Sequence, residues 1–341
     1  MIMKKATTFT RFFGGLFVIL LCLAVGFNTA LAAQKPIVLK IAHQGFPPYV
    51  FINATTSHWA KLIKERTNGA VELKFYYDTL AKGPGILAAA QQGVADGFAC
   101  ISSFLTGRVR PLNVLELYVN GAAGRYPEVV EAIRPTMDKI FAQQDIKYCG
   151  SIYSYKSVTY THSNRHFHKP DDLKGQKIRL PGMWGSKLLK MWGATPMMIL
   201  PPELYTSAQR GIIDSVGTIN MLIDVFKLYE VHKYITEFPN SMGAVTIIGL
   251  NMNAFEKLDK KYQEIILQAG KEAEAFSWEY GRKQEDELQQ KLKKLTNYYV
   301  QTPEEYKVFL DSIWPIVPEA RKHSGPLGEE LMDIIQKTKK Q

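Results

Sequence analysis

Long apolar runs, cysteine and catalytic signature motifs are all scarce in this 341-residue sequence. Past residue 27 no apolar stretch approaches the roughly 20 residues that a membrane-spanning helix needs. A total of three cysteines excludes a disulfide-rich scaffold. The motifs G-x-S-x-G, H-E-x-x-H and the Walker loop do not occur, so nothing points to the hydrolases, zinc proteases and nucleotidases that carry them.

The N-terminus has the pattern of a cleaved secretory signal. Lys4 and Lys5 precede an apolar run over residues 12–27, and Ala30-Leu31-Ala32 places small residues at the cleavage positions. We therefore predict a signal peptide over residues 1–32 and a mature chain in the periplasm. No cysteine directly follows the predicted cleavage position, so a lipid anchor is not expected.

Two cysteines, Cys100 and Cys149, lie in the predicted mature chain. An oxidising compartment would permit a disulfide between them, and their separation is also compatible with two unpaired buried thiols. The sequence leaves both possibilities open.

Basic residues outnumber acidic ones by 42 to 32, which gives a formal net charge of +10. Loss of residues 1–32 would remove three positive charges and no acidic residue, leaving +7. This surplus argues weakly for anionic ligands and gives no reason to expect a nucleic acid partner.

Strand and helix patterns alternate along the mature chain, and its roughly 309 residues are enough for two lobes with separate cores. This alternation predicts an α/β fold with largely parallel sheets covered by helices. Such sheets bind ligands at the carboxyl ends of their strands. The clearest early elements are strands at 37–42, 71–76 and 94–101 and helices at 85–92 and 127–144.

Residues 170–214 contain the most informative pattern. Lys177-Ile178-Arg179-Leu180 alternates charged and apolar residues until Pro181-Gly182 stops the strand, which places Arg179 at a strand exit. Pro201-Pro202 then begins a helix, and Gly211 ends it before another extended run.

A long helix is predicted near the C-terminal third. Residues 258–295 contain no proline and have helical composition throughout, with Gly270 and Gly281 as possible bends. At 1.5 Å per residue such a helix would be about 57 Å long, which exceeds one small lobe. We expect it to span both lobes.

These residues resemble the periplasmic solute-binding receptors of tripartite ATP-independent (TRAP) transporters, in the dicarboxylate-receptor family. The motifs that carry the resemblance are D-L-K-G-x-K-I-R-x-P at 172–181, G-A-x-P at 193–196 and E-x-Y-x-x-x-Q-x-G-I-I-D at 203–214. They occur in the family's order and approximate spacing, and the weaker resemblance extends from about residue 41 to about residue 284.

The resemblance implies a two-lobe periplasmic binding protein with a hinge and a long lobe-spanning helix. Lobe I would comprise residues 33–156 plus 244–284, and lobe II residues 157–243 plus 285–341. It also implies one small and one large integral membrane subunit, driven by an ion gradient. We expect a monomer and no cofactor.

Arg179 is the first candidate for ligand binding. A guanidinium presents parallel N–H donors that match both oxygens of a carboxylate. In the family, the arginine of K-I-R-x-P binds the ligand's carboxylate, and an ion pair unrelated to ligand is the alternative for this position.

The chain departs from the family pattern after Asp214. Many relatives continue D-G-x-E-N, where the asparagine contacts the acid end of the ligand. Here Thr218 occupies the aligned position, and Asn220 lies two residues beyond on the same face of the predicted strand, so we expect one of them to supply that hydrogen bond. A second basic residue of many relatives has no counterpart, Lys156 being the nearest cation.

Aromatic side chains near the predicted loop ends are candidates for the walls of the site. Trp184 is favoured because it follows Arg179 by five residues, and His43 ends the first predicted strand. Packing in a core is the alternative for each of them. The aromatic candidates are Phe46, Tyr49, Tyr153, Tyr155, Trp184 and Tyr205.

His166 and His168 share a strand face, but no third metal ligand lies near them in sequence, so no metal site is expected.

We therefore predict a receptor that binds a small organic acid in an interlobe cleft and delivers it to a TRAP permease. With one firm cation, a monocarboxylate with a compact, partly apolar body is expected to bind better than a dicarboxylate or a sugar acid. A periplasmic ligand-binding partner of a sensor kinase is an alternative, and a periplasmic enzyme acting on carboxylates is another.

Overall fold

The computed structural model describes residues 35–45, 50–117, 123–241 and 244–338. Apart from residues 35–37, these belong to one compact unit, Val38–Gln341. The predicted signal peptide and Phe46 lie outside the described residues.

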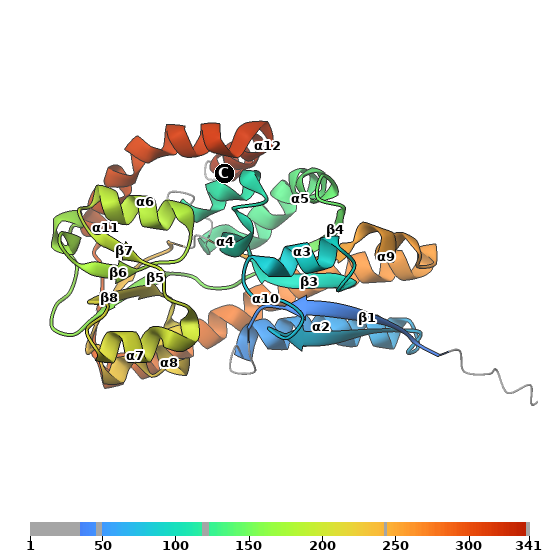
Figure 1. Ribbon diagram of the computed structural model, residues 1–341, viewed down its shortest axis with the longest axis horizontal. Helices are drawn as coiled ribbons and strands as arrows, with labels where there is room; N and C mark the ends of the chain where they lie inside the picture. Colours follow the sequence, from blue (N-terminus) through green and yellow to red (C-terminus); the bar gives the residue numbers. More distant parts are fainter. Residues whose placement is uncertain (1–34, 46–49, 118–122, 242–243, 339–341) are drawn as a thin grey trace, which may run out of the picture. The chain divides into compact units, whose positions relative to one another are not determined.

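The described chain forms two mixed sheets, each covered by helices (Figure 1). We call the five-stranded sheet and the helices on it lobe I, and the six-stranded sheet and its helices lobe II. The order in lobe I is β2 (Val71–Tyr77), β1 (Ile37–His43), β3 (Gly97–Ile101), β10 (Thr246–Asn251) and β4 (Ile146–Ile152). The order in lobe II is β11 (Asn297–Val300), β9 (Tyr234–Phe238), β5 (Val158–His162), β8 (Ser215–Thr218), β6 (Lys177–Arg179) and β7 (Thr195–Met197).

The helices fall mainly between strands, as the alternation predicted. The α-helices are α2 (Val50–Arg66), α3 (Gly85–Gln91), α4 (Ser102–Leu105), α5 (Tyr126–Ala142), α6 (Met183–Met191), α7 (Leu204–Gln209), α8 (Asn220–Val225), α9 (Met252–Glu256), α10 (Lys260–Leu295), α11 (Pro303–Ile313) and α12 (Val317–Lys337). The 3₁₀ helices are η1 (Arg110–Glu116), η3 (Ala123–Arg125), η4 (Pro170–Leu173), η5 (Pro201–Glu203), η6 (Leu228–Glu230) and η7 (Trp314–Ile316).

The expectation of largely parallel sheets needs a correction at β5 and β10. β10 is antiparallel to β3 and β4, and β5 is antiparallel to β8 and β9, while β1 with β3 and β6 with β8 are parallel. Both exceptions follow a direct crossing between the sheets, from β4 to β5 and from β9 to β10, with no helix in between. A strand that the chain enters directly from the other sheet starts at the edge where the neighbouring strands end. It therefore runs opposite to those neighbours.

The long helix α10 is continuous over 36 residues, close to the predicted span (Figure 1). It packs against α2 and β4 in lobe I and against α8 and β11 in lobe II. Gly270, which we considered a possible bend, is instead a point of close approach: a Cβ there would lie 2.2 Å from the carbonyl oxygen of Cys149. Small residues on this face allow the helix to lie directly on β4.

The two mature cysteines are buried and free. Their strands β3 and β4 are separated by β10, so the two backbones are about two strand spacings, roughly 9.5 Å, apart. This exceeds the roughly 7 Å beyond which two cysteines cannot be bridged. The alternative of two buried thiols therefore describes the structure.

The C-terminal helix α12 packs against η1 and α5, which accompany the lobe I sheet. The predicted boundaries assign residues 285–341 to lobe II. The β11 part of that segment does pair with β9 of the lobe II sheet. The contacts of α12 thus differ from the predicted assignment, and the lobe boundaries stay a prediction.

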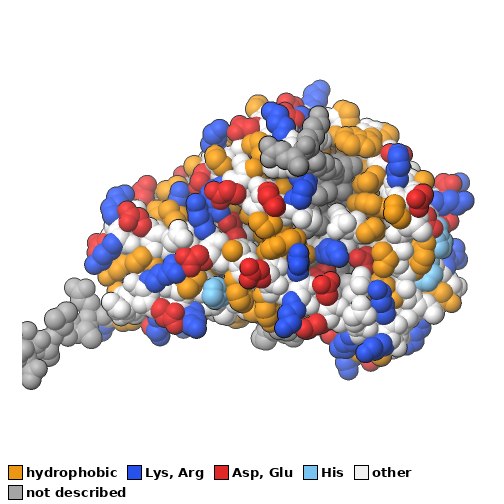
Figure 2. All heavy atoms as spheres, turned by 180° about the vertical axis from the view of Figure 1, so that it is seen from behind, with side chains coloured by type: hydrophobic (Ala, Val, Ile, Leu, Met, Phe, Trp, Pro, Cys, Tyr) orange, Lys and Arg blue, Asp and Glu red, His pale blue; other side chains and the backbone are white. Residues whose placement is uncertain are grey.

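Charged groups of both signs are interspersed on the surface. On the face drawn in Figure 2, Lys and Arg side chains alternate with Asp and Glu over the described part of the chain. The positive net charge is therefore spread out on this face, with no large basic patch of the kind that nucleic acid binding needs.

A buried carboxyl of α10 lies beside the segment that connects β4 to β5. Glu285 is 3% exposed, and its Oε2 accepts a hydrogen bond from the backbone N–H of Lys156 at 3.3 Å. Within the described residues its Oε1 has no hydrogen-bond partner. Burial raises the pKa of Glu285 to about 8, so the folded protein favours the neutral form.

We predict that Glu285→Gln changes how stability depends on pH. In the unfolded chain a glutamate ionises near pH 4.3, so wild-type stability should fall relative to the variant as pH rises from about 4.5 to about 8. Below pH 4 the difference between the two should be constant. Denaturant unfolding of both proteins at several pH values measures this, and parallel stability curves would contradict it.

Candidate functional site

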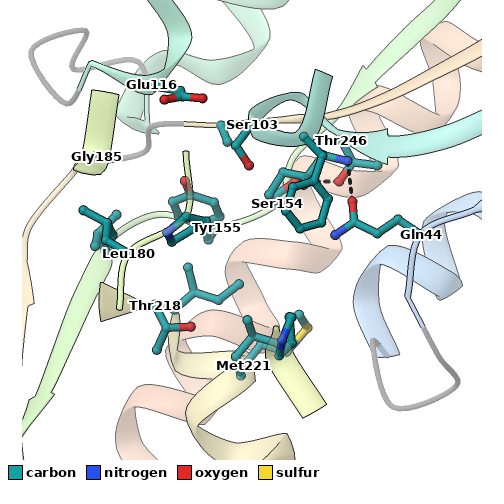
Figure 3. Close-up of a pocket in the computed structure, with 18 of the residues that line it drawn as sticks. Gln44, Ser103, Glu116, Ser154, Tyr155, Leu180, Gly185, Thr218, Met221 and Thr246 are labelled. Atoms are coloured by element: carbon teal, nitrogen blue, oxygen red, sulfur yellow. Dashed lines mark hydrogen bonds between the residues drawn. The ribbon is translucent and has the colours of Figure 1, made fainter. Parts of the chain in front are cut away.

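A cavity of about 90 Å³ lies where strands of both sheets begin or end (Figure 3). Its walls come from the carboxyl ends of parallel strands and from the starts of the two reversed strands. In lobe I these residues are Gln44 after β1, Ile101 ending β3, Ser154 after β4 and Thr246 opening β10. In lobe II they are Arg179 ending β6, Thr218 ending β8 and Val158 opening β5.

The walls are mainly apolar. Ile52, Phe104, Leu180, Met221 and Leu222 contribute aliphatic and aromatic surface, and Tyr155 adds a ring. In such a setting a polar group interacts more strongly with a ligand than it would in water. The few polar side chains therefore decide what the cavity can hold.

Arg179 lies in the cavity wall and is 4% exposed. Its Nε donates a hydrogen bond to the carbonyl of Ile199 at 3.1 Å, and its Nη1 donates to the carbonyl of Gly217 at 3.4 Å. These two backbone carbonyls hold the plane of the guanidinium in place. Arg179 is the basic residue among the described residues that line the cavity.

Thr218 lies beside this arginine at the end of β8 and also lines the cavity. Its hydroxyl is buried and has no hydrogen-bond partner among the described residues. A buried hydroxyl without a partner costs about 1–3 kcal/mol. A ligand oxygen in the cavity would remove that cost.

Asn220 is placed differently from the strand-based expectation. The strand ends at Thr218, and Asn220 begins α8, so alternation along a strand no longer relates the two side chains. The Asn220 Oδ1 accepts a hydrogen bond from the hydroxyl of Tyr298 at 3.1 Å, and Asn220 is not among the residues that line the cavity.

Trp184, Tyr153 and His43 are buried and stand outside the cavity lining. The Trp184 indole N–H donates to Asn113 Oδ1 at 2.8 Å, and the Tyr153 ring packs 5.1 Å from the ring of Trp278. His43 Nε2 lies 3.1 Å from Thr56 Oγ1, and burial lowers the His43 pKa to about 4. Whether any of them contacts a ligand stays a prediction.

Gln44, next to His43, reaches the cavity instead. Its Oε1 accepts the backbone N–H of Ile101 at 2.8 Å, and Figure 3 shows the rest of its side-chain amide directed toward the cavity. A strand exit was recognisable in the sequence, but which of two adjacent residues faces inward depends on the register with β3.

Glu116, at the end of η1, was not predicted from the sequence and lines the same cavity. Its Oε1 accepts the hydroxyl of Thr106 at 2.9 Å, and its Oε2 accepts the backbone N–H of Trp184 at 3.0 Å. Burial raises the Glu116 pKa to about 7. No sequence motif marks this residue, because its partners lie 10 and 68 positions away.

The histidine pair lies at the edge of lobe II. His168 Nδ1 is 2.8 Å from Glu305 Oε1, and the His166 and His168 rings are 6.2 Å apart. In the described residues no three His, Cys, Asp or Glu side chains gather in a way that could hold a metal ion.

None of the helices in the described part of the chain is long and apolar enough to cross a membrane.

The chain belongs to the family of bacterial extracellular solute-binding proteins, family 7 (DctP), whose model matches residues 42–323. This confirms the resemblance to the TRAP solute receptors. A curated relative is the 2,3-diketo-L-gulonate-binding periplasmic protein YiaO of Escherichia coli K12, which is 24% identical over 287 residues, covering 80% of this chain and 84% of that protein.

Solved structures of TRAP receptors share the fold. DctP7 of Bordetella pertussis, an extracytoplasmic solute receptor binding pyroglutamic acid, matches with a TM-score of 0.80 and 20% identity over 88% of this chain and 99% of that one. A TRAP periplasmic solute-binding protein of Ralstonia eutropha H16 with bound (S)-2-acetolactate matches with a TM-score of 0.74 and 22% identity over the same shares. The expected two-lobe binding-protein fold with a lobe-spanning helix is thereby confirmed.

We predict that Arg179→Ala abolishes ligand-induced thermal stabilisation while the unliganded protein still folds. Arg179→Lys should also weaken binding more than tenfold, about 1.4 kcal/mol, because a single ammonium lacks the planar pair of donors. Calorimetric titration of both variants and the wild type gives the comparison. Binding by the lysine variant within about twofold of wild type would contradict a bidentate contact.

Proposed function

We propose that this protein is the extracytoplasmic receptor of a TRAP uptake system. It binds a small organic acid in the cavity between the strand ends of its two lobes and delivers it to the membrane permease. The observation that carries the proposal is Arg179, a buried arginine oriented by two carbonyls in an apolar cavity, beside the unpartnered hydroxyl of Thr218. Family membership supports it.

The ligand carboxylate binds to Arg179, and Thr218 donates a hydrogen bond to it. Of the two hydroxyl or amide candidates after Asp214, Thr218 is favoured because it lines the cavity. Trp184, Tyr153 and His43 are further candidates for ligand contact, and Asn220 orients the start of α8 through Tyr298.

The ligand is a monocarboxylate with a compact, partly apolar body. One arginine in the described lining can neutralise one carboxylate, and a second buried carboxylate without a partner would cost several kcal/mol. The cavity volume of about 90 Å³ is below the roughly 300 Å³ at which the usual range for ligand clefts begins. Relatives with pyroglutamic acid or acetolactate bound agree with this class, and others hold the sugar acids galacturonate and glucuronate.

The protein acts as a receptor and not as an enzyme. Family members are binding and transport receptors, and the polar groups at the cavity are suited to hold an anion. A cleaved signal over residues 1–32 delivers the chain to the periplasm, where a small and a large integral membrane subunit receive the ligand. The monomer is the working unit.

A thermal-shift screen of the protein lacking residues 1–32 tests the ligand class. We expect 2-oxo, 2-hydroxy or lactam monocarboxylates to stabilise it more than succinate, malate or glucuronate. A ligand at 100 times its dissociation constant should add about 2.7 kcal/mol. Strong stabilisation by succinate or a hexuronate alone would contradict the monocarboxylate class, and turnover of a bound ligand would contradict the receptor role.

A further inference from the structure

Glu116 places a second ionisable group in the cavity that contains Arg179. The two side chains come from different lobes: Glu116 ends η1, which packs with α4 and α12, whereas Arg179 ends β6. In Figure 3 Glu116 lies at one end of the drawn cavity and Thr218 at the other, with Leu180 and Tyr155 between them. Because Arg179 donates to the carbonyl of Gly217, next to Thr218, the carboxylate-binding end is opposite Glu116.

The carboxyl of Glu116 is held in a fixed position. The hydroxyl of Thr106 and the backbone N–H of Trp184, in the first turn of α6, each donate to one of its oxygens. The turn before α6 is shaped to this group: Gly182 has φ of 92°, and a Cβ there would lie 2.6 Å from Glu116 Oε2. Because Gly182 has no Cβ, the carboxyl can lie directly against that turn.

Capping of α6 accounts for only part of the carboxyl's hydrogen-bonding capacity. A carboxylate has about four lone-pair sites. Among the described residues, the Thr106 hydroxyl and the backbone N–H of Trp184 use two of them. A carboxylate that lines an apolar cavity and keeps acceptor capacity can take a further donor, and a ligand in the cavity is placed to supply it.

We propose that Glu116 is a specificity-determining residue for the ligand. It accepts a hydrogen bond from an N–H or O–H group on the body of a monocarboxylate whose acid end binds Arg179. When it is ionised, it also repels a second carboxylate at the same end of the cavity. This inference rests on the proposed function, and it narrows the ligand class to monocarboxylates with a donor at the end remote from the acid.

The test compares acids that differ only in that donor. 4-Hydroxybutyrate has a terminal hydroxyl that butyrate lacks; 5-hydroxypentanoate and pentanoate form a second pair, and succinate supplies a second carboxylate. Dissociation constants are measured by calorimetry for the wild type, Glu116→Gln, Glu116→Asp and the control Glu203→Gln. Glu203 is exposed and lies in η5, outside the cavity lining.

The wild type and the Glu203→Gln control should bind the donor-bearing member of at least one pair about tenfold more tightly than its partner. In Glu116→Gln that ratio should fall to within about twofold, and succinate should bind more tightly than to the wild type. Glu116→Asp keeps the charge but not the reach, so it should lose the donor preference and still reject succinate.

A solely structural Glu116 gives a different result. Glu116→Gln and Glu116→Asp would then weaken both members of each pair by the same factor, and the ratios would stay at the wild-type value, which overturns the inference while leaving the receptor function intact. Absence of a donor preference in the wild type overturns it as well. Failure of the wild type to bind any of the five acids would count against both the receptor function and the role of Glu116.

Discussion

The reversal of one strand in each lobe is the constraint on which the site depends. The chain leaves the lobe I sheet after β4 and enters lobe II as β5, and it leaves lobe II after β9 and returns as β10. Because both strands run opposite to their neighbours, the carboxyl ends of the parallel strands and the starts of β5 and β10 meet at one cavity. Each lobe therefore contributes backbone ends and polar side chains to the same small volume.

A basic and an acidic side chain then mark the two ends of this cavity. Arg179 is oriented by carbonyls of Ile199 and Gly217, and Glu116 is oriented by Thr106 and the first turn of α6. The remaining walls are mainly apolar. In such surroundings an unpaired charge is costly, so a ligand that matches only one of the two ends is disfavoured relative to one that matches both.

The sequence predicted the elements of the fold better than the directions of their side chains. Proline-free composition predicted α10, and the K-I-R-x-P motif predicted that Arg179 ends a strand, because both signals are local. The antiparallel direction of β5 and β10 depends on the crossings between lobes, which no local pattern encodes. For the same reason Glu116 was missed, and so was Gln44, which directly follows the predicted candidate His43 and lines the cavity. Thr218 and Asn220 were both candidates from the aligned position; Thr218 lines the cavity, and the early end of β8 explains why Asn220 faces Tyr298.

A crystal structure of the mature chain with its tightest-binding monocarboxylate tests the central claim most directly. The account predicts the ligand's two carboxylate oxygens within hydrogen-bond distance of the Arg179 guanidinium, with the Thr218 hydroxyl donating to one of them. A carboxylate bound in this cavity without contact to Arg179, or a ligand bound elsewhere on the chain, would contradict it.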